Sequence, residues 1–189
     1  MSDKANNNLI PPHGGYRKLM SYQMSEIVYD ATVRFCERFI DKRSRTFDQM
    51  VQAARSGKQN IVEGSMASGT SKKIELKLIG IARASLEELL QDYEDFLRQR
   101  NLKLWDKNDP KVLEIRKIGK EENKSYMSYE TYIENSPEEV AANTIICIIH
   151  QTNYLLDQQK RKLEEIFLKE GGFTERMYKL RKDNRSNKK

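Results

Sequence analysis

Apolar residues recur at three- and four-residue intervals along most of the chain, and this spacing predicts long amphipathic helices. The first run predicts a helix over residues 17–41, and later runs predict helices over 46–65, 72–100 and 137–170. No segment alternates apolar and polar residues as a half-buried strand does, so we predict an all-α protein. The apolar face of the first helix comprises Met20, Met24, Ile27, Val28, Ala31, Phe35 and Phe39.

Two short polar segments, 41–45 and 64–71, separate the first three predicted helices. Connections this short make successive helices antiparallel, so the expected fold is an up-down-up-down four-helix bundle. An insertion at 101–135 precedes the last helix. Within it, Pro110 suits the first position of a short helix that ends near Lys120.

The last long helix has sequence signals at both ends. Ser136 is expected to be the N-cap and to form a capping box with Glu139. Gly171 and Gly172 are expected to end the helix through a left-handed backbone. The chain then divides into a flexible arm at 1–16, the bundle with its insertion at 17–170, and a basic tail at 171–189 in which a short helical turn resumes at Thr174.

The segment 52–64, QAARSGKQNIVEG, has few large apolar residues although it lies within a predicted helix. We place the turn to the next helix near residues 67–68, which sets a second group of small residues opposite the first. Small residues on both helices let the two backbones approach closely. We therefore interpret the segment as a helix–helix contact rather than a ligand site. The expected facing pairs are Ala53–Ala82, Ala54–Ile81, Arg55–Gly80 and Gly57–Leu78, with Glu63–Lys72 and Gln52–Arg83 as polar ties.

Catalytic and metal-binding signals are sparse, and we expect no enzymatic activity, no metal and no cofactor. The two histidines, His13 and His150, lack the Glu-x-x-His pairing of metal-binding bundles. The glycine-bearing segment 64–71 lacks the endings of the phosphate-binding loops. An alternative that stays open is a hydrolase or lyase site at Asn60, Glu63 and Arg83.

Composition agrees with a helical protein of the cytoplasm. Apolar residues make up 38% and charged residues 33% of the 189 residues, with 9 Gly and 4 Pro. No apolar run is long enough to cross a membrane, and the N-terminus lacks the apolar core of a secretory signal. Cys36 and Cys147 fall in apolar helical segments, so we expect buried free thiols in a reducing compartment.

The last long helix carries more apolar surface than one stripe. Consecutive apolar residues at 145–149 point around most of the helix, and a surface helix needs only one apolar face. Part of the cover could come from the insertion, and we expect the rest to come from self-association. The residues expected at that interface are Ile145, Ile146, Ile148 and Ile149.

Positive charge is concentrated near the C-terminus. The net charge is +6, and residues 174–189 hold seven basic against two acidic residues, which leaves the rest of the chain near +1. In the expected topology this tail shares one end of the bundle with the start of the first helix and with the 64–71 turn. That end could be a solvated surface or could contact nucleic-acid phosphates, and a membrane is less favoured. The cations expected to bind phosphates are Arg17, Lys18, Lys72, Lys73, Lys77, Arg176, Lys179, Arg181, Lys182 and Arg185.

Two short motifs resemble a bacterial four-helix-bundle family first described as proteins encoded in intervening sequences of large-subunit ribosomal RNA genes. The family pattern Q-x-x-R-A-x-S-I-x-x-N-I-A-E-G is similar to QMVQAARSGKQNIVEG, and A-R-G-S-L-x-E-L is similar to ARASLEEL. The later part of the chain resembles the longer branch with a "four helix bundle suffix". The matching positions are Gln49, Ala53, Ser56, Asn60, Ile61, Glu63, Gly64, Arg83, Ser85, Leu86 and Glu88.

The resemblance implies a non-enzymatic protomer that assembles as a pentamer and has a basic surface. One branch of the family is the accessory variability determinant of diversity-generating retroelements, which binds a reverse transcriptase and its RNA. Here Val51 and Gln52 replace a basic pair, and the insertion at 101–135 replaces a short connection, so we move the expected nucleic-acid surface to the tail end of the bundle. The leading hypothesis is a homo-oligomeric protein that binds RNA or DNA backbone. The alternative is a protein–protein scaffold, for example for a reverse transcriptase, without nucleic-acid contact.

Overall fold

The computed structural model describes residues 9–186, and within them the chain forms helices and turns and no strand. The prediction of an all-α protein is confirmed. The elements are η1 (Tyr16–Lys18), α1 (Met20–Phe39), α2 (Arg45–Ala67), α3 (Lys72–Gln99), α4 (Pro110–Ile118), η2 (Tyr126–Ser128), α5 (Glu130–Glu134), α6 (Glu138–Glu170) and α7 (Phe173–Ser186).

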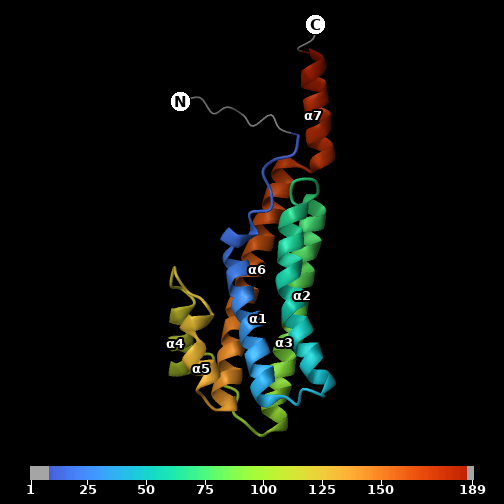
Figure 1. The fold of residues 1–189 in the computed structure, drawn as a ribbon. Helices are drawn as coiled ribbons and strands as arrows, with labels where there is room; N and C mark the ends of the chain where they lie inside the picture. Colours follow the sequence, from blue (N-terminus) through green and yellow to red (C-terminus); the bar gives the residue numbers. More distant parts are fainter. Residues whose placement is uncertain (1–8, 187–189) are drawn as a thin grey trace.

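The four long helices α1, α2, α3 and α6 run side by side, and the short α4 and α5 lie against one side of them (Figure 1). Neighbouring long helices pack in the order α1–α2–α3–α6 and back to α1. Phe35 is fully buried among them, with its ring 4.9 Å from those of Tyr93 and Phe96. The predicted apolar stripes therefore meet in one core. In the described part of the chain, no helix combines the length and apolar character needed to cross a membrane.

Side-chain caps explain where three of the helices begin. The Ser44 side chain accepts from the backbone N–H of Thr46, and the Ser71 side chain accepts from that of Ile74. Asp109 caps α4, whose first residue is Pro110 as predicted. A side-chain oxygen at an N-cap satisfies an N–H that has no partner within the helix.

The predicted capping box at the start of α6 is wrong. Pro137 is the N-cap, and Ser136 instead donates its hydroxyl to the backbone oxygen of Thr131. Glu139 accepts from the indole N–H of Trp105 at 3.2 Å. Both side chains thus have partners in the insertion, which outcompete the local cap. The other end agrees with prediction, because α6 stops at Gly171 with φ +71°.

The helices α2 and α3 do pack closely, but not in the predicted register. A Cβ on Gly57 would lie 2.8 Å from Leu86 Cγ, and one on Gly64 would lie 3.4 Å from Leu78 Cβ. The predicted pairing of Gly57 with Leu78 is therefore displaced by about two helical turns. The reason is that α2 continues to Ala67, so the turn lies later than residues 67–68.

This displacement also removes the predicted polar ties. Lys72 pairs with Glu75 at 3.0 Å rather than with Glu63, and Arg83 pairs with Glu87 at 2.6 Å rather than with Gln52. Of the second group of small residues, Ala82 is buried, whereas Ala84 is exposed and Gly80 faces open space.

The insertion covers the broad apolar surface of α6. Residues 141–149 are all buried, and α4 and α5 both contact α6 on a side that the other long helices leave open. Ile145, Ile146, Ile148 and Ile149 are thus buried within one chain, and the prediction that they form an interface between copies is corrected. The sequence indicates that the insertion could supply part of this cover, but it does not reveal how the insertion folds back or how much of α6 it covers.

The C-terminal tail is more ordered than a single turn. The helix α7 has 14 residues and projects beyond the end of α6 (Figure 1), with no buried residue and no extensive contact with another helix. At the same end, the described part of the N-terminal arm lies against the last turn of α2, where Gly14 N–H donates to Ser65 O at 3.1 Å. The rest of the predicted arm, residues 1–8, and the tail lysines Lys188 and Lys189 lie outside the described residues.

Candidate nucleic-acid interface

Helix α7 presents a basic face to solvent. Arg181, Lys182 and Arg185 follow Tyr178 at intervals of three, four and seven residues, a spacing that places them on one side of a helix. All four side chains are exposed, and together with Ser186 they line one shallow hollow on the helix surface. The face therefore combines one aromatic ring with three cations.

The acidic residues of α7 do not neutralise this face. Glu175 accepts from the backbone N–H of Gly172 at 2.9 Å, so its carboxylate is used at the start of the helix, where negative charge is favourable. Asp183 forms no ion pair within residues 9–186. The same holds for all five predicted cations of the helix: Arg176, Lys179, Arg181, Lys182 and Arg185.

The other predicted cations lie at the end of the molecule from which α7 projects. Lys73 and Lys77 are exposed at the start of α3, and Lys18 is exposed in η1, which contacts α1 and α2. The guanidinium of Arg17 lies 5.1 Å from the centre of the Tyr16 ring. We call this surface, together with the exposed side chains of α7, the basic end.

Lys72 differs from the rest of that group. Its ammonium is bound to Glu75, whose residue is only 7% exposed. Glu75 lies in the first turn of α3, where a carboxylate is stabilised by the helix dipole. Lys72 therefore belongs to a local pair at the helix start and is not an uncommitted cation.

The motif residues of α2 and α3 form polar contacts within α2 and between the two helices. The hydroxyls of Ser56 and Ser85 are 2.9 Å apart, and the Asn60 amide donates to the Ser56 backbone oxygen at 2.8 Å. Gly64 permits the close approach described above. A shallow groove of about 460 Å³ runs beside them, lined by Arg45, Asp48, Gln49, Gln52, Ala53, Ser56, Ser85 and Glu88.

The alternative catalytic group does not converge on one point. Asn60 is bonded to Ser56, Arg83 is paired with Glu87, and Glu63 is exposed. Elsewhere, burial raises the pKa of the Cys147 thiol to about 11, which keeps it neutral. No group of three or more potential metal ligands occurs among residues 9–186.

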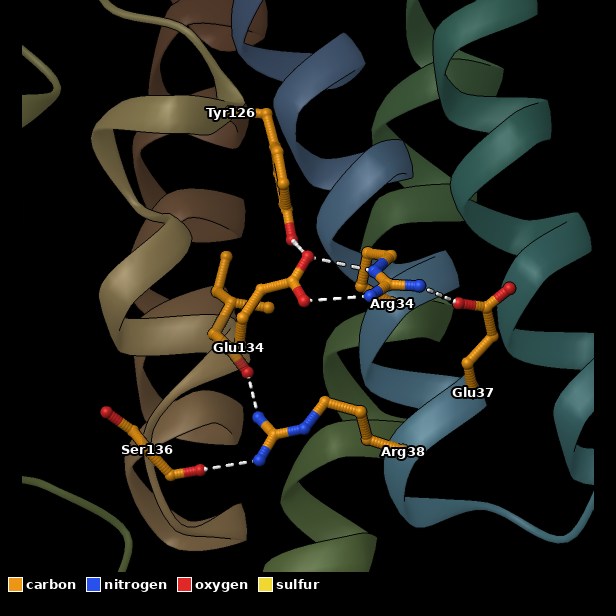
Figure 2. A network of polar contacts seen from close by, with 7 residues as sticks. Arg34, Glu37, Arg38, Tyr126, Glu134 and Ser136 are labelled. Atoms are coloured by element: carbon orange, nitrogen blue, oxygen red, sulfur yellow. Dashed lines mark hydrogen bonds and ion pairs between the residues drawn. The ribbon is translucent and has the colours of Figure 1, made fainter.

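A second polar cluster, which the sequence did not indicate, joins α1 to the insertion (Figure 2). Arg34 donates to both carboxylate oxygens of Glu134, at 2.9 and 2.8 Å, and the Tyr126 hydroxyl donates to the same carboxylate at 2.7 Å. These hydrogen bonds lower the pKa of Glu134 to about 2. One turn further along α1, Arg38 donates to the backbone oxygens of Ile133 and Ser136.

This cluster holds the insertion rather than forming a site for a ligand. Its donors and acceptors are used within the protein, and Arg34 makes a further pair with Glu37. The two partners Arg34 and Glu134 are 100 residues apart in the chain, so no local pattern could have revealed the pair.

Comparison with protein-family models, with curated proteins and with solved structures found no match to this chain. The resemblance to the intervening-sequence family therefore stays a prediction.

Proposed function

We propose that the protein binds the sugar-phosphate backbone of RNA or DNA, without reading base sequence, through α7 and the neighbouring part of the basic end. The observation that carries this proposal is a projecting helix with five cations, four of them exposed and none paired with a carboxylate among the described residues. Phosphate contacts from Lys and Arg supply most of the affinity in sequence-independent binding.

Two further features support the proposal. The basic face lies beyond the packed helices, so a long polyanion can approach it without clashing with them (Figure 1). Lys73 and Lys77 also lie at this end and can extend the positive surface. Contacts from cations to phosphates do not depend on the base sequence, which is why we propose backbone binding.

We also propose a fold and an assembly for the protein. We propose that α1, α2, α3 and α6 form a four-helix bundle with residues 101–135 as an insertion, and that the protein is a homo-oligomer, with a pentamer as the expected form. Ile74 and Ile81, which are 49% and 39% exposed on α3, offer a small apolar surface for self-association. Light scattering at micromolar concentration tests this, and a single species of 22.2 kDa would contradict it.

Salt-dependent binding tests the proposed function. A fluorescein-labelled oligonucleotide is titrated by anisotropy at several salt concentrations with the wild-type protein and with R181Q/K182Q/R185Q. Each lost phosphate contact lowers the slope of log K against log salt by about 0.7 for a single strand. The triple variant is therefore expected to bind more weakly, with a slope smaller by about 2.

A charge-matched control exists at the other end of the molecule. Lys42, Arg43 and Arg45 are exposed around the α1–α2 connection, far from α7 (Figure 1). The variant K42Q/R43Q/R45Q removes the same charge, and we expect it to keep the wild-type slope. Equal slopes in both variants would contradict an assignment to α7. Absence of binding by the wild-type protein would favour the alternative, a protein–protein scaffold.

A further inference from the structure

The aromatic residue in the basic face has no structural role that the described contacts reveal. Tyr178 is 71% exposed, and its hydroxyl forms no hydrogen bond within residues 9–186. Arg181 and Lys182 lie on the same face one turn further along the helix, and Thr174 and Glu175 lie one turn before it. Exposing a large ring in water forgoes the free energy that its burial would gain.

An exposed ring beside cations has a specific use in nucleic-acid binding. Proteins that bind single strands combine cations that follow the backbone with aromatic rings on which bases stack. Each base has a flat face, so stacking adds affinity without sequence preference. In a duplex the base faces are covered by neighbouring bases, and only the backbone and the groove edges are accessible.

We propose that the substrate of the basic end is single-stranded nucleic acid, with Tyr178 as a stacking platform for one base and with Arg181 and Arg185 on the adjacent phosphates. This inference rests on the proposed function and names the class of nucleic acid bound. A cation beside the ring also favours stacking, because guanidinium groups interact with the faces of bases.

An anionic membrane fits the same helix less well. A helix that lies in a membrane surface inserts a face rich in large apolar residues. The large apolar residues Phe173, Met177 and Leu180 of α7 are half-buried, and Tyr178 is the only apolar side chain among its exposed residues. The exposed surface is therefore cationic with a single ring, as stacking on a single strand requires.

The test compares Tyr178→Ala with a matched control. Tyr154 on α6 is 63% exposed, and the residues one turn away on its face are His150, Gln151, Asp157 and Gln158, none of them Lys or Arg. Tyr154→Ala therefore removes an equally exposed ring outside a basic surface. Tyr178→Phe keeps a ring that can stack. Circular dichroism establishes that each variant keeps its helix content.

Binding is measured by anisotropy with three probes of about 16 nucleotides, within the range of known single-strand site sizes. The probes are an oligothymidylate, a duplex, and an abasic deoxyribose-phosphate strand that keeps the charge without bases. We expect Tyr178→Ala to weaken binding to the oligothymidylate about tenfold, and to change binding to the duplex and the abasic strand by less than about twofold. Tyr178→Phe and Tyr154→Ala are expected to retain wild-type binding.

Four outcomes overturn the inference. If Tyr178→Ala binds the oligothymidylate as the wild type does, or loses equal affinity for all three probes, Tyr178 does not stack on bases, while backbone binding itself stands. If the wild type binds no probe, the proposed function fails with it. If it binds phosphatidylserine vesicles and none of the probes, the partner of α7 is a membrane.

Discussion

The two halves of α6 differ in how far they are buried, although they belong to one uninterrupted helix. Residues 141–149 are buried on every side, enclosed by α1, α3 and the insertion. Residues 157–170 are mostly exposed, and Leu163 is the one buried residue among them. The first half fixes the fold, and the second half carries the chain out to α7, where charge is left available for a partner.

This comparison separates stability from binding. Substitutions in the core should alter the free energy of unfolding, and substitutions at exposed positions beyond residue 157 should leave it almost unchanged. Charged side chains that bind a partner cannot at the same time be paired within the protein. The candidate interface therefore lies on α7, outside the packed helices.

The largest expected effect is in the core. Phe35→Ala removes a fully buried ring that contacts Tyr93 and Phe96, and such truncations cost about 3–5 kcal/mol of unfolding free energy. Leu168→Ala is the control, because that side chain is 83% exposed and its loss should cost less than about 0.5 kcal/mol. Urea denaturation followed by circular dichroism measures both. Similar losses of unfolding free energy in the two variants would contradict the distinction between the buried core and the exposed second half of α6.

Two glycines in adjacent helices test the close contact of α2 with α3. A Cβ on Gly57 would meet the fully buried Leu86 at 2.7 Å, whereas one on Gly80 would enter open space. Gly57→Ala should therefore destabilise by about 1–3 kcal/mol. Gly80→Ala should stabilise by about 0.5–1 kcal/mol, because alanine favours the helix. A stabilising Gly57→Ala would show that the helices are further apart than described.

A smaller effect is expected where the insertion is fastened to α1. Glu134→Gln removes the carboxylate that Arg34 and Tyr126 bind, at an expected cost of about 1 kcal/mol, since the Arg34 side chain is partly exposed. Amide hydrogen exchange should become faster in residues 126–136 and stay unchanged in α2. Unchanged exchange in the insertion would show that its apolar contacts alone hold it.

The same pair predicts a dependence on pH. The pKa of Glu134 in the folded protein is about 2, below the ordinary value of 4.5, because Arg34 and Tyr126 donate to its ionised form. A lowered folded pKa stabilises the protein above the ordinary value, and this contribution disappears as the pH falls from about 4.5 towards 2. The difference in unfolding free energy between wild type and Glu134→Gln should thus be present at pH 7 and shrink at pH 3. A difference that is constant with pH would contradict this account.

Sequence reasoning located the helices well and their mutual positions less well. Periodicity and terminal residues such as Pro110 and Gly171 are local signals, so helix limits could be predicted from them. The register of α2 against α3 depends on how the chain turns after Ala67, and a shift of a few residues there displaced every predicted pair. Contacts between distant residues, such as Arg34 with Glu134, have no local signal at all.

The candidate interface was predictable in part. A count of charges along the chain located the basic tail, because local net charge can be read from the composition of a segment. The spacing of Tyr178 and the cations places them on one face if the segment is helical. The sequence predicts only a single helical turn here, whereas α7 extends from Phe173 to Ser186. Lys72 is not a free cation, because it is paired with Glu75 at the start of α3. A count of charges does not show which residues lie close together, so this pair required the structure.

The most direct test of the separation between fold and binding is a chain that ends at Gly171, measured for both properties at once. We predict that its unfolding free energy stays within about 0.5 kcal/mol of the full chain, because α7 buries no residue. Its affinity for an oligothymidylate should fall by more than about tenfold. A chain that loses much of its stability, or that binds the oligonucleotide as tightly as the full protein, would contradict the account.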